Sequence, residues 1–177
     1  MPGQHVTFRH YGISPWEIEV IYDALTRSFA VVDEEREADD SRFVSMIELW
    51  LPMQFNEDFF RFLTFESWFK IKGVFKDIKR RRGRKGLKCF LRFSGFAARD
   101  QTALYFPLLA KNDRHFEMGI EKLEYLVDIV PLQLKGLPDD TEEIWYSYDE
   151  SSLKWHPSHA KVRDLNYTFK NEAWLAR

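Results

Sequence analysis

Hydrophobic and polar residues alternate in several short stretches with the two-residue period of a β-strand. In residues 87–94, Leu87, Cys89, Leu91 and Phe93 share one face, and the polar residues share the other. The other predicted strands are residues 5–11, a buried strand at 43–50, residues 102–109, and a hairpin over 144–155 that turns at 149–152.

Apolar side chains at three- and four-residue spacing predict helices between these strands. Ser14, Pro15 and Glu17 form the pattern of a capping box. This pattern favours a helix over the competing interpretation, a strand at 16–20. Asn56 precedes two acidic residues and is the expected N-cap of the next helix.

Two further stretches carry clear helical patterns. In the first, Trp68, Ile71 and Phe75 share a face, and Gly83 is the expected terminator. The second begins at Asn112 and is expected to stop at Pro131. Its apolar face carries Phe116, Ile120, Leu123, Val127 and Val130, and its opposite face carries Glu117, Glu121, Glu124 and Asp128.

Strands and helices intermingle without strict alternation, which is typical of an α+β protein. We therefore expect a single mixed or antiparallel sheet with about three helices packed on one face and a C-terminal β-hairpin. The chain has 177 residues, 45% hydrophobic and 16% aromatic, which suits one domain with a substantial core. Residues 1–138 are predicted to form the α+β core, and residues 139–177 a hairpin extension packed on it within the same domain.

The predicted location is the cytoplasm. Cys89 is the only cysteine, so an internal disulfide is ruled out, which favours a reducing compartment. The first residues lack the basic and apolar pattern of a signal peptide. No apolar run approaches the roughly 20 residues that span a bilayer, since the nearest, 43–55, is interrupted by Glu48 and Pro52. We therefore expect no membrane partner.

Positive charge is concentrated in the middle of the chain. Residues 79–88 contain seven basic residues and no acid. Residues 70–92 contain eleven Lys and Arg and one Asp, or +10, whereas the whole chain is −2, which leaves −12 for the rest. Because such density repels itself, it indicates a surface for an anionic partner.

A structural explanation covers part of this cluster. Cations near a helix C-terminus stabilise the helix through the carbonyl dipoles, which accounts for Lys79, Arg80 and Arg81. This explanation does not account for the spacing of Lys72, Lys76 and Arg80, which are like charges four residues apart and repel one another. A polar turn between a helix and a strand is the remaining alternative.

The polar face of the strand at 87–94 places Phe90 between two cations. Phosphates on cations and bases on rings are what single-stranded nucleic acid requires. Phe69 is a further candidate stacking platform. The predicted nucleic-acid site is Lys72, Lys76, Arg80, Arg81, Arg82, Arg84, Lys85, Lys88, Phe90 and Arg92.

The predicted function is therefore a non-catalytic protein that binds RNA or single-stranded DNA through this helix–turn–strand segment. The alternative is a protein–protein adaptor or assembly subunit whose basic segment binds an acidic protein surface. The sequence favours a protein that is not an enzyme, because no nucleophile or phosphate-loop motif occurs. An active site assembled from distant residues leaves no local signature, so that question stays open.

Other residues give weaker indications, and we predict no metal and no cofactor. His156 and His159 are separated by Pro157, which prevents a helical pair of zinc ligands. The acidic run at 33–40 lacks the spacing of a calcium loop. Cys89 lies on an apolar strand face, where a thiol is inert.

Aromatic residues between positions 55 and 75 exceed what one helix face can bury. At helical spacing either Phe62 or Phe65 has no place on the buried face of the helix. Aromatic rings are enriched at the centres of subunit interfaces, so we also expect self-association into a homo-oligomer.

Overall fold

A computed structural model describes residues 4–62, 65–96 and 99–177. Within these residues the chain forms nine strands and five α-helices. The strands are β1 His5–Tyr11, β2 Ala30–Glu35, β3 Ser45–Phe55, β4 Leu87–Phe96, β5 Ala103–Leu108, β6 Thr141–Asp149, β7 Lys154–Val162, β8 Leu165–Lys170 and β9 Ala173–Ala176. The helices are α1 Pro15–Thr26, α2 Glu57–Phe62, α3 Phe65–Arg82, α4 Asp113–Glu121 and α5 Val130–Gln133, with 3₁₀ turns η1 Gly83–Lys85 and η2 Glu124–Leu126.

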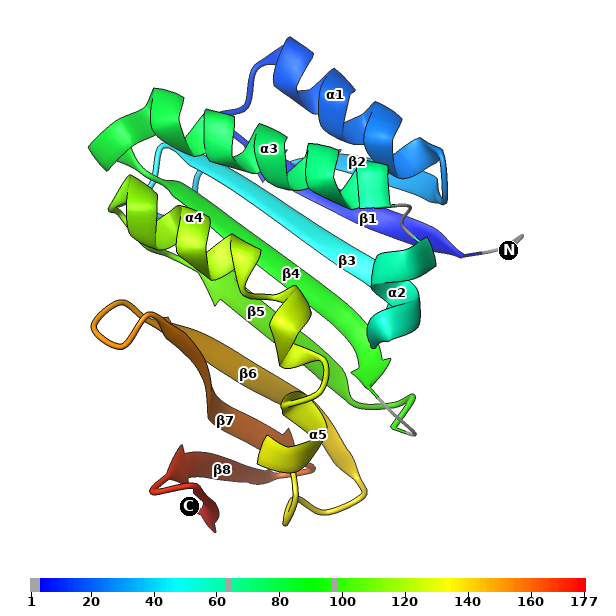
Figure 1. Ribbon diagram of the computed structural model, residues 1–177, viewed down its shortest axis with the longest axis vertical. Helices are drawn as coiled ribbons and strands as arrows, with labels where there is room; N and C mark the ends of the chain where they lie inside the picture. The colour runs from blue at the N-terminus through cyan, green and yellow to red at the C-terminus, as the bar shows by residue number, and fades with distance from the viewer. Residues whose placement is uncertain (1–3, 63–64, 97–98) are drawn as a thin grey trace.

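All nine strands belong to one mixed sheet, in the order β2-β1-β3-β4-β5-β6-β7-β8-β9. Three pairs of consecutive strands are parallel, namely β1 with β2, β3 with β4, and β5 with β6, and helices connect the strands of each pair. From β6 to β9 the strands follow one another antiparallel. Figure 1 shows the helices lying together on one face of the sheet.

The predicted fold class is wrong in its helix count and in its C-terminal end. The structure has five helices in the described residues, and the C-terminal part is a four-stranded continuation of the sheet where a hairpin was expected. The stretch predicted as one helix to Pro131 is divided into α4, η2 and α5. Pro131 lies in the first turn of α5, where its missing amide needs no partner, so it helps to begin a helix there. The strands β8 and β9 were missed because their residues are mostly polar or exposed, with weak alternation.

Local signals in the sequence are confirmed elsewhere. Ser14 Oγ accepts from the Glu17 amide at 3.2 Å and Glu17 Oε1 accepts from the Ser14 amide at 2.9 Å, so the capping box begins α1. The competing strand at 16–20 is therefore wrong. Asn56 Oδ1 accepts from the Phe59 amide at 2.9 Å at the start of α2. Gly83 has φ +55° and follows the last residue of α3.

The core lies between the sheet and the helices. It contains the inward residues of the central strands, such as Leu91 and Phe93 of β4, together with Phe75 of α3. Phe55 and Phe59 pack edge-on against Phe93 at 4.9 and 4.8 Å between ring centroids. The opposite face of the sheet has no helix of the described residues over it (Figure 1). No described helix is long and apolar enough to cross a membrane. Phe62 and Phe65, the rings expected to be left over, have side chains outside the described part.

The turn after β1 depends on a glycine. Gly12 has φ +64°, and a Cβ there would collide with the carbonyl oxygen of Val44. We expect Gly12→Ala to lower the free energy of unfolding by about 2 kcal/mol or more, measured by urea denaturation.

The matched control is Gly73→Ala in the middle of α3, where a Cβ would meet nothing within 4 Å. Alanine is the better helix former, so this variant should gain about 0.5–1 kcal/mol. Equal effects at both positions would contradict the described turn.

Candidate functional site

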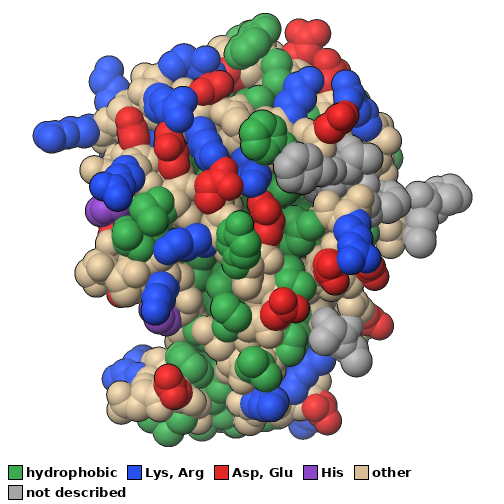
Figure 2. All heavy atoms as spheres, viewed as in Figure 1, with side chains coloured by type: hydrophobic (Ala, Val, Ile, Leu, Met, Phe, Trp, Pro, Cys, Tyr) green, Lys and Arg blue, Asp and Glu red, His purple; other side chains and the backbone are tan. Residues whose placement is uncertain are grey.

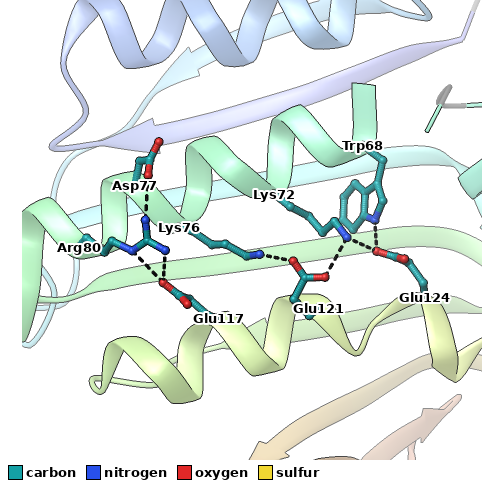
Figure 3. A network of polar contacts seen from close by, with 8 residues as sticks. All are labelled: Trp68, Lys72, Lys76, Asp77, Arg80, Glu117, Glu121 and Glu124. Atoms are coloured by element: carbon teal, nitrogen blue, oxygen red, sulfur yellow. Dashed lines mark hydrogen bonds and ion pairs between the residues drawn. The ribbon is translucent and has the colours of Figure 1, made fainter. Parts of the chain in front are cut away.

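Three cations of the predicted basic segment, Lys72, Lys76 and Arg80, point toward α4 and η2 and are paired there (Figure 3). Lys72 Nζ donates to Glu121 Oε2 at 3.1 Å and to Glu124 Oε1 at 2.6 Å. Lys76 Nζ donates to the other oxygen of Glu121. Trp68 Nε1 donates to Glu124 Oε1 at 2.5 Å, which fixes this carboxylate from a second side. These contacts place the polar face of α3 in an interface between two helices.

The pairing continues toward the end of α3. Arg80 lies 2.6 Å from Glu117 and 3.3 Å from Asp77, through its two terminal nitrogens. The order of partners, 124 and 121 for Lys72 and then 117 for Arg80, shows that α3 and α4 run antiparallel along the contact. Each inter-helix contact therefore offsets part of the repulsion between neighbouring cations of α3.

Lys79 is the most deeply placed of these cations, with a fully buried side chain. Its ammonium donates to Asp113 Oδ1 at 2.5 Å, to the Lys111 carbonyl at 2.7 Å and to the Gly83 carbonyl at 3.0 Å. All three donors of the ammonium are thereby used, as a buried charge requires. Lys79 ties the C-terminus of α3 to the start of α4.

On its other side α3 is tied to α1 through one carboxylate. Glu17 is 3% exposed and accepts from Arg82 at 2.7 Å and from Arg81 at 2.7 Å. Arg82 also donates to Ser45 Oγ at 2.8 Å, at the start of β3. Burial raises the pKa of Glu17, but the Ser14 amide and the two guanidinium groups outweigh it and lower the pKa to about 2.

The remaining predicted residues are dispersed. Lys88 Nζ donates to Asp39 Oδ1 at 2.7 Å. Arg84 and Lys85 are exposed in η1, and Arg92 lies on the uncovered face of the sheet. Six of the nine predicted cations thus have carboxylate partners within the described residues. The prediction that the segment contacts a polyanion stays a prediction, but its premise of unneutralised charge holds only for Arg84, Lys85 and Arg92.

A signal for this pairing was present in the sequence. Cations recur at 72, 76 and 80 on one helix, and acids recur at 117, 121 and 124 on another. Two stripes of opposite sign and similar spacing can pair along antiparallel helices. The acids were placed only on the face opposite the apolar residues and were not compared with the cations, so this complementarity was missed.

The uncovered sheet face carries a row of aromatic and cationic side chains in one register. Trp50 of β3 pairs with Arg92 of β4, Arg92 with Tyr105 of β5, Tyr105 with Trp145 of β6, and Trp145 with His159 of β7. We call these five residues the aromatic row. Their sequence neighbours, such as Leu91 and Phe106, point into the core, so the row points away from the helices.

Members of the aromatic row stack on one another. The guanidinium groups of Arg9 and Arg92 lie 3.9 and 4.7 Å from the Trp50 ring centroid. Tyr105 and Trp145 are parallel within 3°, at 4.1 Å between centroids, and Trp145 lies 5.6 Å from His159.

Ring faces within the aromatic row are therefore occupied by neighbours. Bases stack on free ring faces, and a self-stacked row offers mainly ring edges to a partner. Arg92 Nε donates to the Tyr105 hydroxyl at 3.1 Å, which fixes the centre of the row. The aromatic row was missed from the sequence because its members come from five strands whose order the sequence does not show.

Next to the aromatic row is a hollow of about 730 Å³ with balanced charge. Its charged lining consists of Arg9, Arg36, Lys88, Glu35, Glu37, Asp39 and Glu48. Phe90, a predicted stacking platform, also lines it, with the Lys88 ammonium 5.8 Å from its ring centroid. Three cations against four acids do not form a cationic groove.

Groups with redox or metal chemistry are few in the described part of the chain. It holds no cluster of three or more His, Cys, Asp or Glu placed to bind a metal ion. Burial raises the pKa of the Cys89 thiol to about 12, which keeps it protonated and unreactive. His156 lies 3.4 Å from Ser152, while His159 belongs to the aromatic row.

The chain matches no family model, no curated protein and no solved structure.

Removing the charge of Glu17 should destabilise the helix layer. In Glu17→Gln, Arg81 and Arg82 lose a buried anionic partner, so we expect a loss of about 2–4 kcal/mol in urea denaturation. The matched control is Glu142→Gln, because Glu142 and Lys161 form an exposed pair at 3.5 Å. That control should change stability by less than about 0.5 kcal/mol. A similar loss in both variants would rule out a special role for Glu17.

Glu17 also predicts the acid sensitivity of the fold. Its pKa is lowered from an ordinary value of 4.5 to about 2, so its stabilisation is complete above about pH 4.5 and is lost as the pH falls toward 2. The stability difference between the wild type and Glu17→Gln should therefore shrink by about 2 kcal/mol between pH 5 and pH 3. Urea denaturation at both pH values measures this difference, and a constant difference would show that the carboxylate keeps an ordinary pKa.

Proposed function

We propose that the protein is a non-catalytic assembly subunit that pairs with a second copy of itself through the uncovered face of its sheet. The observation that carries this proposal is the aromatic row, Trp50, Arg92, Tyr105, Trp145 and His159, on a face that no described helix covers.

The uncovered face has the size that a stable dimer needs. The strands β1, β3, β4, β5, β6 and β7 are neighbours in the sheet, and the five spacings between them, about 4.8 Å each, give a width of about 24 Å. The ten residues of β4 extend about 33 Å. The product, roughly 800 Å², is close to the area that each partner contributes to a standard interface.

The chemistry of the aromatic row is that of an interface centre. Trp, Tyr and Arg are the residue types that carry most binding energy in protein–protein contacts. Because Tyr105 and Trp145 are already held parallel by stacking, their ordering on association costs little side-chain entropy. Two such sheets can pack face to face at about 10 Å.

Charges around the aromatic row also favour protein over polyanion. Arg9 is paired with Glu34 at 2.9 Å and with Glu48 at 3.5 Å. Cations that are already matched by acids attract phosphate only weakly. On this face the unmatched cation is Arg92.

Nucleic-acid binding is the second candidate function. The observation that favours it is that Arg84 and Lys85 are exposed in η1 with no carboxylate partner among the described residues. These cations lie at the end of α3, away from the aromatic row.

The test is the mass of the protein in solution. The chain has a mass of 21.2 kDa, so light scattering after size exclusion should give twice that mass for the wild type. Trp145→Glu places a charge in the aromatic row and should give the monomer mass, because an unpaired charge at an interface centre is costly.

The matched control is Trp16→Glu, which makes the same change at an exposed ring on α1 and should stay dimeric. Urea denaturation of both variants establishes that they are folded. A monomeric wild type, or a dimer unaffected by Trp145→Glu, would overturn the proposal. The second candidate would be favoured if the wild type retains a single-stranded oligonucleotide and the double variant Arg84→Glu, Lys85→Glu does not.

A further inference from the structure

A second hollow lies on the helix side of the molecule, between the η2–α5 segment and strands β7 and β8. Its volume is about 760 Å³, within the range of ligand sites. The apolar lining consists of Tyr125, Leu126, Ile129, Leu132, Trp155 and Phe169. In Figure 2, hydrophobic side chains gather over the lower half of this face, where η2 and α5 lie. We call this hollow the lysine-rimmed groove, for the reason given below.

The walls of the lysine-rimmed groove are fixed by hydrogen bonds. Gln133 of α5 accepts from the Tyr146 hydroxyl at 2.9 Å through its side chain and from Trp174 Nε1 at 3.0 Å through its carbonyl. Trp155 Nε1 donates to the Gly119 carbonyl at 2.8 Å. The helix segment and the C-terminal strands are thereby tied together, so the hollow exists before any ligand enters.

Apolar side chains at this site remain in water. Tyr125 is 74% exposed, Leu132 62% and Ile129 43%. All three line the hollow, so the exposed apolar surface lies around a single site. Contiguous exposed apolar surface indicates a site that something apolar covers.

Three lysines surround the hollow without an anionic partner. Lys122, Lys135 and Lys154 line it, and none has a carboxylate within 4.0 Å among the described residues. Lys122 donates to the Leu153 carbonyl at 2.5 Å, which leaves its charge uncompensated. The only acid in the lining is Glu172.

The lysines of α3 that point toward α4 differ from these three. There Lys72, Lys76 and Lys79 each have a carboxylate within 4.0 Å. A protein that neutralises its lysines at one helix interface leaves three of them unmatched around an apolar hollow. Charge complementarity therefore calls for an anion at the rim and an apolar body inside.

We infer that the lysine-rimmed groove binds an amphiphilic carboxylate, a medium-chain fatty acid or a molecule of the same chemistry. The aliphatic chain lies against Trp155, Phe169 and Ile129, and the carboxylate is held by Lys135 and Lys154. This site is separate from the uncovered sheet face and does not depend on self-association.

The test is calorimetric titration of the full chain with octanoate, decanoate and dodecanoate. Binding should saturate at one ligand per chain, and each addition of two methylenes should tighten it about tenfold, because each buried methylene contributes about 0.8 kcal/mol. Decan-1-ol, which has the chain without the charge, should bind at least about tenfold more weakly than decanoate.

Two variants locate the site. Lys154→Glu should weaken decanoate at least about tenfold and leave decan-1-ol nearly unchanged, whereas Leu132→Glu should weaken both ligands. The matched control, Lys70→Glu, reverses an exposed charge on α3 outside the lining and should bind decanoate as the wild type does.

Absence of saturable binding, equal affinity for the acid and the alcohol, or affinity independent of chain length would overturn the inference. So would equal losses in Lys154→Glu and Lys70→Glu. If Leu132→Glu instead halves the mass in solution, the groove is covered by a second copy and the inference is wrong. The mass of the wild type and of Trp145→Glu is read separately, so failure of one proposal does not imply failure of the other.

Discussion

The pairing of the α3 cations with carboxylates of α1 and α4 is the interaction on which the arrangement of the helix layer depends. Lys79 is buried and fully hydrogen bonded, and Glu17 joins two guanidinium groups of α3 to α1. Removing one member of such a buried set leaves a charge without a partner, which is far more costly than losing an exposed ion pair. The dense positive charge of the sequence is thus largely compensated within the fold, by acids that lie far away along the chain.

This compensation decides which surfaces remain for partners. The helix layer is closed along α3 and α4, whereas the opposite face of the sheet keeps the aromatic row and the region around α5 keeps the lysine-rimmed groove. In each of these two places an uncompensated cation lies beside aromatic or aliphatic surface, Arg92 in the first and Lys154 in the second. The proposed self-association and the inferred carboxylate site follow from that shared feature.

Much of the local structure could be predicted from the sequence, because it depends on residues close together in the chain. The capping box of Ser14 and the alternation around Cys89 required no knowledge of distant partners. The helix ends around Pro131 were predicted wrongly, because a proline that stops one helix can equally begin another. The ion-pair partner of Lys72 could not be predicted from the sequence, because Glu121 lies 49 residues away along the chain. The aromatic row depends on the order of five strands, and alternation in single strands does not contain that order.

A double-mutant cycle between Lys72 and Glu124 tests the central claim most directly. Lys72→Met, Glu124→Gln and the double variant are compared with the wild type by urea denaturation. If α3 is held to the segment α4–η2 through this pair, as the 2.6 Å contact indicates, the coupling energy should be about 1–3 kcal/mol. A coupling energy within about 0.3 kcal/mol of zero would show that the two charges act independently, and the α3 cations would then be available to an external polyanion.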